Sequence, residues 1–192
     1  MRAFIAVELP GNVRDALVSV QRALTTTGAD VKWVEADNLH VTMRFLGEIT
    51  QAQRQTIESL LLEVARGRAP IDAALSKVGT FPERGMPRVI WVGIGQGADQ
   101  LSRLAQEIER GLAALSIPNE ERRFTAHVTL GRVRAPRAGE VIRQRLTQIR
   151  WTPPAPFRIE RVTLFQSTLG HTGAVYTALG RFAFTADRAV SS

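Results

Sequence analysis

One four-residue pattern occurs twice in this chain of 192 residues, and it constrains the fold more than any other feature. His40-Val41-Thr42-Met43 and His127-Val128-Thr129-Leu130 both read histidine, apolar, threonine, apolar, and they lie 87 positions apart. Each copy lies in a segment that the apolar pattern predicts to be a β-strand. Strand side chains alternate between two faces, so the histidine and threonine of each copy share one face. The repetition predicts two similar halves that bring both copies to one cleft.

The hydrophobic periodicity elsewhere predicts strands that alternate with helices. Helical spacing of apolar residues marks four segments, residues 13–24, 57–64, 101–112 and 142–149. Thr50 and Gln53 have the spacing of a capping box before the second of these helices. Extended segments are expected at residues 2–8, 31–34, 39–46, 71–78, 88–93, 124–133, 157–165 and 174–184. No linker rich in Pro, Gly or Ser divides the chain, so we expect one domain over residues 1–184 and a flexible tail over residues 185–192.

Composition narrows the class of protein further. The absence of cysteine excludes disulfides, thiol chemistry and cysteine-ligated zinc. The net charge is +7, and every basic residue except Lys32 and Lys77 is arginine, the side chain best suited to bidentate phosphate contacts. This favours a phosphorylated partner, with a merely solvated basic surface as the alternative. No apolar run is long enough to cross a bilayer or to act as a signal peptide, so we expect a soluble, cytoplasmic protein without a membrane partner.

Two histidines and two threonines in one cleft suit an in-line displacement at phosphorus. One neutral imidazole can deprotonate an attacking water while the other, protonated, gives a proton to the departing oxygen. Histidine fits both tasks because its ordinary pKa, about 6.5, lets both forms coexist near neutrality. Threonine hydroxyls can donate hydrogen bonds to the non-bridging oxygens, which removes the need for a metal or another cofactor. A strained cyclic phosphate is an apt substrate.

Two other interpretations of the motifs stay open at this point. A single histidine on a half-buried strand is most often structural, although two copies that use two of only three histidines weaken this interpretation. A zinc site requires three or four ligands, and neither motif has a carboxylate two residues away on the same face. The third histidine, His171, lies in a turn flanked by glycines and is expected to be an exposed loop residue.

The contexts of the two motifs resemble the two-histidine (2H) phosphoesterases. Within that superfamily they are most similar to the bacterial and archaeal RNA 2′,3′-cyclic phosphodiesterases, also known as 2′-5′ RNA ligases. The resemblance covers nearly all of residues 2–184. It rests on Arg2 to Val7, Trp33 with Asn38 to Gly47, Val89 to Gly93, Phe124 to Arg132, and Leu164 to Ser167 with Tyr176.

The resemblance implies an α+β fold with two pseudo-symmetric lobes, each an antiparallel sheet backed by helices, and an active cleft between them. It also implies that His40 and His127 are the acid and the base, and that Thr42, Thr129 and Arg132 hold the phosphate. The implied reaction opens a 2′,3′-cyclic phosphate to a 2′-phosphate, with His40 protonating the 3′ oxygen and His127 activating water. The implied partners are RNA ends or nucleotides, with tRNA among the candidates, and a monomer would suffice.

Two residues near the ends of the motif strands need separate treatment. Strict alternation places Arg132 on the face opposite His127, so a phosphate contact requires a bulge or a strand end, which Gly131 permits. A surface arginine is the alternative. Phe45 lies on the face of Val41 and is expected to be a core residue.

Two further functions also stay open. The first is the joining of tRNA halves through a 2′-5′ bond, which reverses the same displacement with a ribose 5′-hydroxyl in place of water. The second is a non-catalytic RNA-binding module that uses the arginine-rich surface without turnover. The two intact motifs argue against the second, because a binder needs the charge but not both imidazoles.

Overall fold

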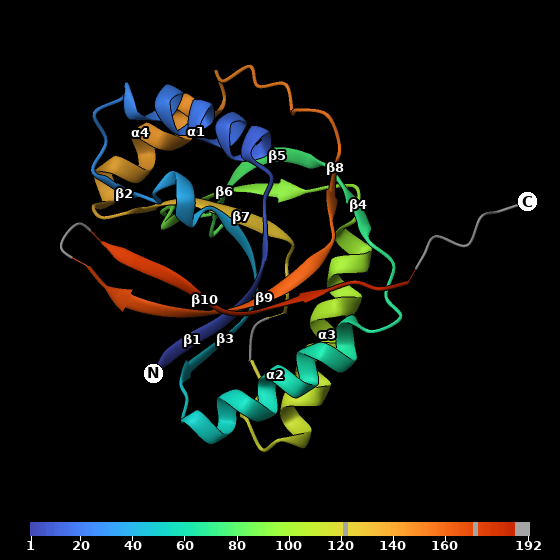
Figure 1. Cartoon of the computed structure of the whole chain (residues 1–192). Coiled ribbons are helices and arrows are strands. Elements are labelled where there is room, and N and C mark those ends of the chain that lie inside the picture. Colours follow the sequence, from blue (N-terminus) through green and yellow to red (C-terminus); the bar gives the residue numbers. More distant parts are fainter. Residues whose placement is uncertain (121–122, 171–172, 187–192) are drawn as a thin grey trace, which may run out of the picture.

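Ten β-strands lie in the part of the chain that this computed structural model describes, residues 1–120, 123–170 and 173–186. They are β1 (Arg2–Glu8), β2 (Val31–Trp33), β3 (His40–Glu48), β4 (Ile71–Ala73), β5 (Leu75–Phe81), β6 (Val89–Ile94), β7 (His127–Val133), β8 (Phe157–Ile159), β9 (Arg161–Leu169) and β10 (Ala174–Ala183). Eight of them form one sheet in the order β10-β9-β1-β3-β7-β6-β5, with β2 paired to β7 (Figure 1). β4 and β8 form a second, small sheet, and the strand pairs of both sheets are antiparallel.

The N-terminal strand lies inside the main sheet. β1 pairs with β3 on one side and with β9 on the other. Its residues from Ala3 to Val7 are at most 3% exposed. A continuous apolar run of this kind is typical of a strand that is covered on both faces, and the predicted strand over residues 2–8 is confirmed.

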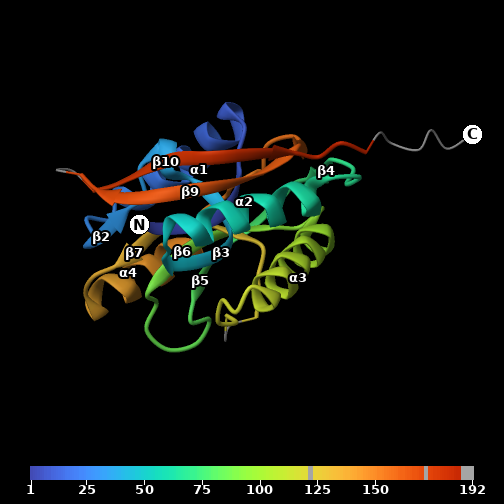
Figure 2. The same cartoon turned by 60° about the horizontal axis from the view of Figure 1, so that its bottom comes forward.

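Four α-helices pack on the main sheet in two pairs within the same described residues. They are α1 (Gly11–Thr25), α2 (Gln51–Ala65), α3 (Ala98–Ala114) and α4 (Pro136–Leu146). α1 contacts α4, and α2 lies beside α3 (Figures 1 and 2), so each pair combines a helix from the first half of the chain with one from the second. The predicted capping box is present at the start of α2, because the Thr50 and Gln53 side chains each accept a hydrogen bond from the other's backbone N–H.

The main sheet has two halves that meet where β3 contacts β7. One half contains β10, β9, β1 and β3, with α2 packed on β9 and β10 and α3 packed on β3. The other half contains β7, β6, β5 and β2, with α4 packed on β5 and β7. Val41 pairs with Val128 at the junction, and both side chains are fully buried. The expected α+β class is confirmed, but the two expected sheets are joined into one.

Two predicted strands are divided in the structure. The segment 71–78 forms β4 and β5, separated at Ala74, and the segment 157–165 forms β8 and part of β9, separated at Glu160. The cause is a change of partner, because β4 pairs with β8 while β5 pairs with β6 and β9 pairs with β1 and β10. Ala74 instead exchanges backbone hydrogen bonds with Gly95 and Gln96. Apolar pattern alone does not reveal such a change, since the strands on both sides of each break have buried residues.

The first residues after β10 contact the segment that follows α2. Thr185 Oγ1 accepts a hydrogen bond from the Gly67 backbone N–H, and Ala186 N–H donates to the Arg68 carbonyl. The first two residues of the expected tail are therefore held against the segment after α2. Residues 187–192 and His171 lie outside the described residues. None of the described helices is long and apolar enough to cross a membrane.

Candidate active site

His40 is the first residue of β3 and follows a 3-10 turn, η1 (Ala36–Asn38). The His40 Nδ1–H donates to the Asn38 carbonyl at 2.7 Å, and His40 Nε2 lies 2.9 Å from Thr42 Oγ1. Because a carbonyl only accepts, the contact with Asn38 keeps a proton on Nδ1 and leaves Nε2 as the atom that gains or loses one. Asn38 is itself held by a hydrogen bond from its Nδ2 to the Ala174 carbonyl of β10. The turn and β10 thus fix the direction of the imidazole.

His127 begins β7 in the same manner. Its Nδ1–H donates to the Thr125 carbonyl at 2.7 Å, and this carbonyl belongs to the residue two positions earlier, as in the first motif. The tautomer is fixed in the same way, so His127 Nε2 is also the atom available for proton transfer. Both imidazoles are half-buried. The sequence repeat therefore corresponds to a repeated local geometry.

The two motifs lie on one face of the sheet, on either side of the junction of β3 with β7. Val41 pairs with Val128, and continuing this antiparallel register puts His40 opposite Thr129 and Thr42 opposite His127. The two valines point into the core, so the histidines and threonines lie on the opposite face, which we call the motif face. The structure thus brings the four predicted side chains together.

A β-bulge in β7 turns Arg132 to the motif face. The register of β7 against β6 slips by one residue at Leu130. Leu130 and Gly131 are consequently both buried, and the alternation resumes with an exposed Arg132 on the same face as His127. The Leu130 carbonyl at the bulge accepts hydrogen bonds from the buried Gln21 side chain of α1 and from the Val34 backbone. The bulge that a phosphate contact by Arg132 requires is therefore present.

The charge of Arg132 reaches both halves of the sheet. Burial lowers the pKa of His127 most, and the charge of Arg132, on the same strand, lowers it further. This charge also acts on Tyr176, which lies on β10 in the other half. Burial raises the pKa of the Tyr176 hydroxyl, and the positive charges of Arg132 and Arg2 oppose that change.

β3 contains the corresponding bulge, and it places Phe45 where the sequence did not predict it. The register of β3 against β1 slips by one residue at Met43, so that Met43 and Arg44 are both buried. Phe45 is 55% exposed and lies on the face of His40. The expectation of a core position for Phe45 is therefore wrong, because it assumed strict alternation. Phe45 and Arg132 are 87 positions apart, as the two motifs are, so they occupy equivalent positions in the repeat. The bulge expected before Arg132 therefore predicts an equivalent bulge before Phe45.

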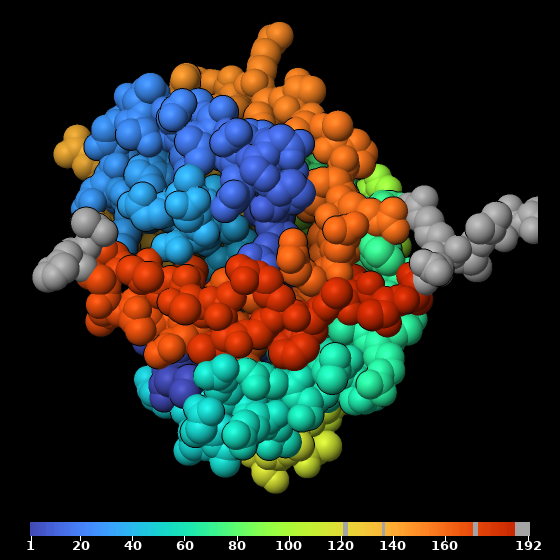
Figure 3. All heavy atoms as spheres, in the orientation of Figure 1, coloured from blue at the N-terminus to red at the C-terminus, as the bar shows by residue number. Residues whose placement is uncertain are grey.

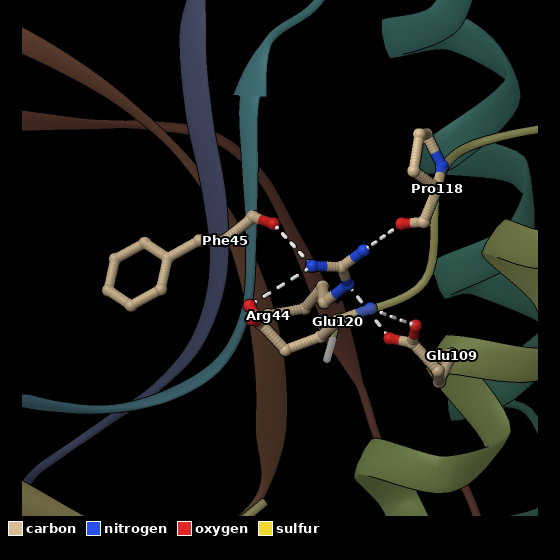
Figure 4. Close-up of polar contacts among 5 residues, drawn as sticks. All are labelled: Arg44, Phe45, Glu109, Pro118 and Glu120. Atoms are coloured by element: carbon tan, nitrogen blue, oxygen red, sulfur yellow. Dashed lines mark hydrogen bonds and ion pairs between the residues drawn. The ribbon is translucent and has the colours of Figure 1, made fainter. Parts of the chain in front are cut away.

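Arg44 holds the bulge of β3 from the interior. Its side chain is only 8% exposed and projects from the opposite side of the strand to Phe45 (Figure 4). Arg44 Nε lies 2.8 Å from a Glu109 carboxylate oxygen, and Nη1 lies 3.2 Å from Glu120 and donates to the Phe45 carbonyl at 2.9 Å. Nη2 donates to the Pro118 carbonyl. The guanidinium thus ties β3 to α3 and to the segment that leads from α3 toward β7.

Aromatic rings border both imidazoles. The ring centroids of Phe4 and Tyr176 lie 4.9 and 5.5 Å from that of His40. The Phe81 ring meets His127 edge to face with 5.2 Å between centroids. Phe81 ends β5 and begins the turn-rich loop of residues 81–87, so that loop starts beside the second motif.

Both histidines have a pKa below the ordinary value. For His40, burial lowers the pKa most, the hydrogen bond to the Asn38 carbonyl opposes it, and the charge of His127 lowers the pKa further. For His127, burial again lowers the pKa most, the hydrogen bond to the Thr125 carbonyl opposes this effect, and the charge of Arg132 lowers the pKa further. Neutral imidazoles are therefore favoured at neutral pH.

A pocket of about 350 Å³ opens beside His40. It lies where α1 and η1 (blue) meet β9 and β10 (orange to red) on the face seen in Figure 3. Tyr176 lines it together with charged residues of its rim, among them Glu8 and Arg181, which form an ion pair at 3.1 Å. Burial raises the pKa of Glu8, but hydrogen bonds from Arg181 and Thr163 outweigh it and lower the pKa overall. The volume lies in the range of about 300–1,000 Å³ that is usual for ligand pockets.

The chemistry available on the motif face is proton transfer and anion binding. Two imidazoles offer Nε2, two hydroxyls can donate hydrogen bonds, and Arg132 supplies a positive charge. Within residues 1–120, 123–170 and 173–186, no group of three or more His, Cys, Asp or Glu side chains is arranged to hold a metal ion.

Residues 13–171 match the family described as the 2′-5′ RNA ligase superfamily, and the chain belongs to that superfamily. The RNA 2′,3′-cyclic phosphodiesterase of Methanothermobacter thermautotrophicus is 29% identical over 182 residues, which are 95% of this chain and 98% of that protein. A solved protein of Thermus thermophilus has a TM-score of 0.80 and 32% identity, covering 97% of this chain and all of that one. E. coli LigT complexed with 3′-AMP has a TM-score of 0.76 and 25% identity over 96% of this chain and 98% of its own. The family resemblance inferred from the sequence is confirmed.

Proposed function

We propose that this protein hydrolyses 2′,3′-cyclic phosphates of RNA or nucleotides to 2′-phosphates without a metal, with His40 and His127 as acid and base. The observation that carries the proposal is the paired geometry of β3 and β7, in which two imidazoles with anchored Nδ1 atoms lie on one face. The relatives support the same activity, since the Methanothermobacter protein is named an RNA 2′,3′-cyclic phosphodiesterase and LigT was solved with 3′-AMP.

In the proposed reaction, the neutral His127 Nε2 takes a proton from water while the water oxygen forms a bond to phosphorus. The bond between phosphorus and the ribose O3′ breaks on the opposite side, and the His40 Nε2–H gives its proton to O3′. The product is a 2′-phosphate with a free 3′-hydroxyl. His40 ends neutral and His127 ends protonated, so proton exchange with solvent restores the starting forms.

Thr42, Thr129 and Arg132 stabilise the negative charge of the reacting phosphate in this proposal. While His40 is neutral, its Nε2 accepts a hydrogen bond from the Thr42 hydroxyl at 2.9 Å. In the proposed reaction the protonated His40 directs its Nε2–H to O3′ instead, and the Thr42 hydroxyl is then free to donate to the phosphate. Donors that are already oriented toward the developing charge contribute about 10²- to 10³-fold each to turnover. The lowered pKa of His127 supplies the neutral base, and the phosphate charge beside His40 favours its protonated form once substrate is bound.

The two halves of the sheet act as two lobes of one domain over residues 1–184, with the substrate between them. Support comes from the junction at Val41 and Val128 and from the reach of the Arg132 charge to Tyr176 in the other half. One chain supplies all five proposed site residues, so a monomer is sufficient. Ligation of tRNA halves through a 2′-5′ bond would use the same groups with a ribose 5′-hydroxyl in place of water.

The test is incubation of the purified protein, in EDTA, with an oligonucleotide and a mononucleotide that both end in a 2′,3′-cyclic phosphate. Chromatography resolves the 2′-phosphate from the 3′-phosphate product, and an added oligonucleotide with a free 5′-hydroxyl reports ligation. His40→Ala and His127→Ala each remove a proton-transfer group, so turnover is expected to fall by about 10²- to 10⁴-fold. His171→Ala, which changes the remaining histidine of the sequence, is the matched control.

A 2′-phosphate product that persists in EDTA and disappears in both site variants is the expected result. A 3′-phosphate product would overturn the choice of O3′ as leaving group while retaining the catalytic pair. Full turnover by both histidine variants would refute the mechanism. A joined product that outweighs the hydrolysed one would make ligation the main activity.

A further inference from the structure

β2 places a second cation beside Arg132. Lys32 pairs directly with Arg132 in the antiparallel register of β2 against β7. Residues directly opposed in such a pair project from the same face of the sheet, and both of these side chains are exposed. Since the bulge puts Arg132 on the motif face, Lys32 lies on that face as well, one strand further from His127.

The two positive charges have no acidic counterpart. Across residues 1–120, 123–170 and 173–186, no carboxylate lies within ion-pair distance of Lys32 or Arg132, whereas nearby Arg134 reaches Asp30 at 3.8 Å. Like charges placed directly opposite each other destabilise a strand pair. A bound anion offsets that repulsion, so the pair of cations is better suited to a ligand than to an empty surface.

The pair also extends the positive charge of the motif face. Arg132 acts on Tyr176 across the two halves, and Arg2, exposed at the start of β1, acts on Tyr176 as well. Lys32, opposite Arg132 on β2, adds a further positive charge one strand away from β7. A ligand that is complementary to these positive charges has more than one negative charge, with the charges spaced along its length.

We propose that Lys32 binds the phosphate next along an RNA chain from the reacting one, so that the preferred substrate is an RNA 3′ end and not a mononucleotide. The inference rests on the proposed function, in which Arg132 contacts the reacting phosphate. Neighbouring strands lie about 4.7–4.9 Å apart, and the flexible side chains of Arg132 and Lys32 spread further, so they reach two successive phosphates. A lysine contact of this kind supplies affinity without sequence preference, because the ammonium group is a point charge.

The test compares Lys32→Gln with Arg103→Gln, which removes one exposed positive charge from α3. Substrates are a tetranucleotide and a mononucleotide that end in the same 2′,3′-cyclic phosphate, and kcat/KM is measured between about 50 and 300 mM salt. Each phosphate contact on a single strand contributes about 0.7 to the slope of log affinity against log salt. Lys32→Gln should therefore raise KM for the tetranucleotide with kcat unchanged. The resulting loss of kcat/KM relative to the unchanged protein should shrink roughly 3.5-fold from low to high salt.

Equilibrium binding of the 2′-phosphate-ended tetranucleotide and of 2′-AMP, measured in parallel, tests Lys32 even if the protein does not turn over. Lys32→Arg keeps the charge and should behave as the unchanged protein on every substrate, which separates loss of charge from damage to β2. Equal losses on the tetranucleotide and the mononucleotide, or equal effects of Lys32→Gln and Arg103→Gln, would overturn the proposal. If the unchanged protein does not turn over either substrate, but Lys32→Gln weakens binding of the tetranucleotide and not of 2′-AMP, the hydrolase function is refuted and the contact between Lys32 and RNA is supported.

Discussion

Replacement of Arg44 by methionine is a sharp test of how the bulge of β3 is held. The methionine keeps an apolar stem of similar length but removes the guanidinium that Glu109 and Glu120 share. The carbonyls of Phe45 and Pro118 lose their donor at the same time. The Glu109 and Glu120 carboxylates, which both contact the guanidinium in Figure 4, are then left without this cation.

The expected cost follows from the burial of these groups. Removing one partner of a buried ion pair costs about 3–5 kcal/mol of unfolding free energy. The Glu109 and Glu120 side chains are 27% and 39% exposed, so both can recover some hydration. We therefore expect Arg44→Met to lower the free energy of unfolding by about 2–3 kcal/mol, or the melting temperature by roughly 4–12 °C for a chain of this size.

Urea denaturation followed by tryptophan fluorescence measures the change, and Arg66→Met is the matched control. Arg66 pairs with Glu63 on the surface, where the two side chains are 67% and 65% exposed. An exposed pair of this kind contributes about 0–1 kcal/mol. Adding Glu109→Gln and Glu120→Gln to Arg44→Met should recover part of the loss, because the uncompensated charges are then removed. Equal stabilities of Arg44→Met and Arg66→Met would show that the network does not hold β3.

Three other predictions concern the site itself. Burial lowers the pKa of both His40 and His127, so kcat/KM should peak below about pH 6.5, falling at lower pH as His127 is protonated and at higher pH as His40 loses its proton. A pH–rate profile with its maximum above about pH 7.5 would contradict this assignment. Thr129→Val should lower kcat by about 10²- to 10³-fold while Thr129→Ser retains most of it, which steady-state kinetics of the two variants compares. Gly131→Ala would put a Cβ 2.7 Å from Val31 Cγ1 and 2.9 Å from Trp33 Cε3, so it should displace β2 and lower both the melting temperature and turnover. Gly11→Ala, with no atom within 4 Å of its added Cβ, should lower neither.

The parts of the fold that local pattern encodes were predictable from the sequence. The stripe of Leu101, Leu104 and Ile108 defines α3, and the capping box at Thr50 defines the start of α2, because both depend on residues within a few positions of each other. The breaks at Ala74 and Glu160 were not predictable, because they depend on which distant strand lies alongside. The joining of the two halves through Val41 and Val128 is non-local in the same sense.

The candidate site shows the same division. The shared face of His40 and Thr42 follows from strand alternation, and the structure places both where alternation predicts. Strict alternation along the strand showed that a phosphate contact by Arg132 requires a bulge. The same assumption of strict alternation, applied to Phe45 without a bulge, led to a wrong prediction. A bulge depends on long-range anchors, here the buried Arg44 and Gln21, and neither anchor has a local sequence signature. Comparing the two halves position by position would have corrected Phe45.

The position of β1 has a consequence for synthesis of the chain. β1 leaves the ribosome long before one of its two partners, β9, which begins only at Arg161. At about 5–20 residues per second, β9 follows β1 after roughly 8–30 s. During that interval the edge of β1 that β9 later covers, with Phe4 and Ile5 on it, stays open to pairing with other chains. Premature release or truncation before β9 should therefore yield aggregates and not a folded N-terminal half.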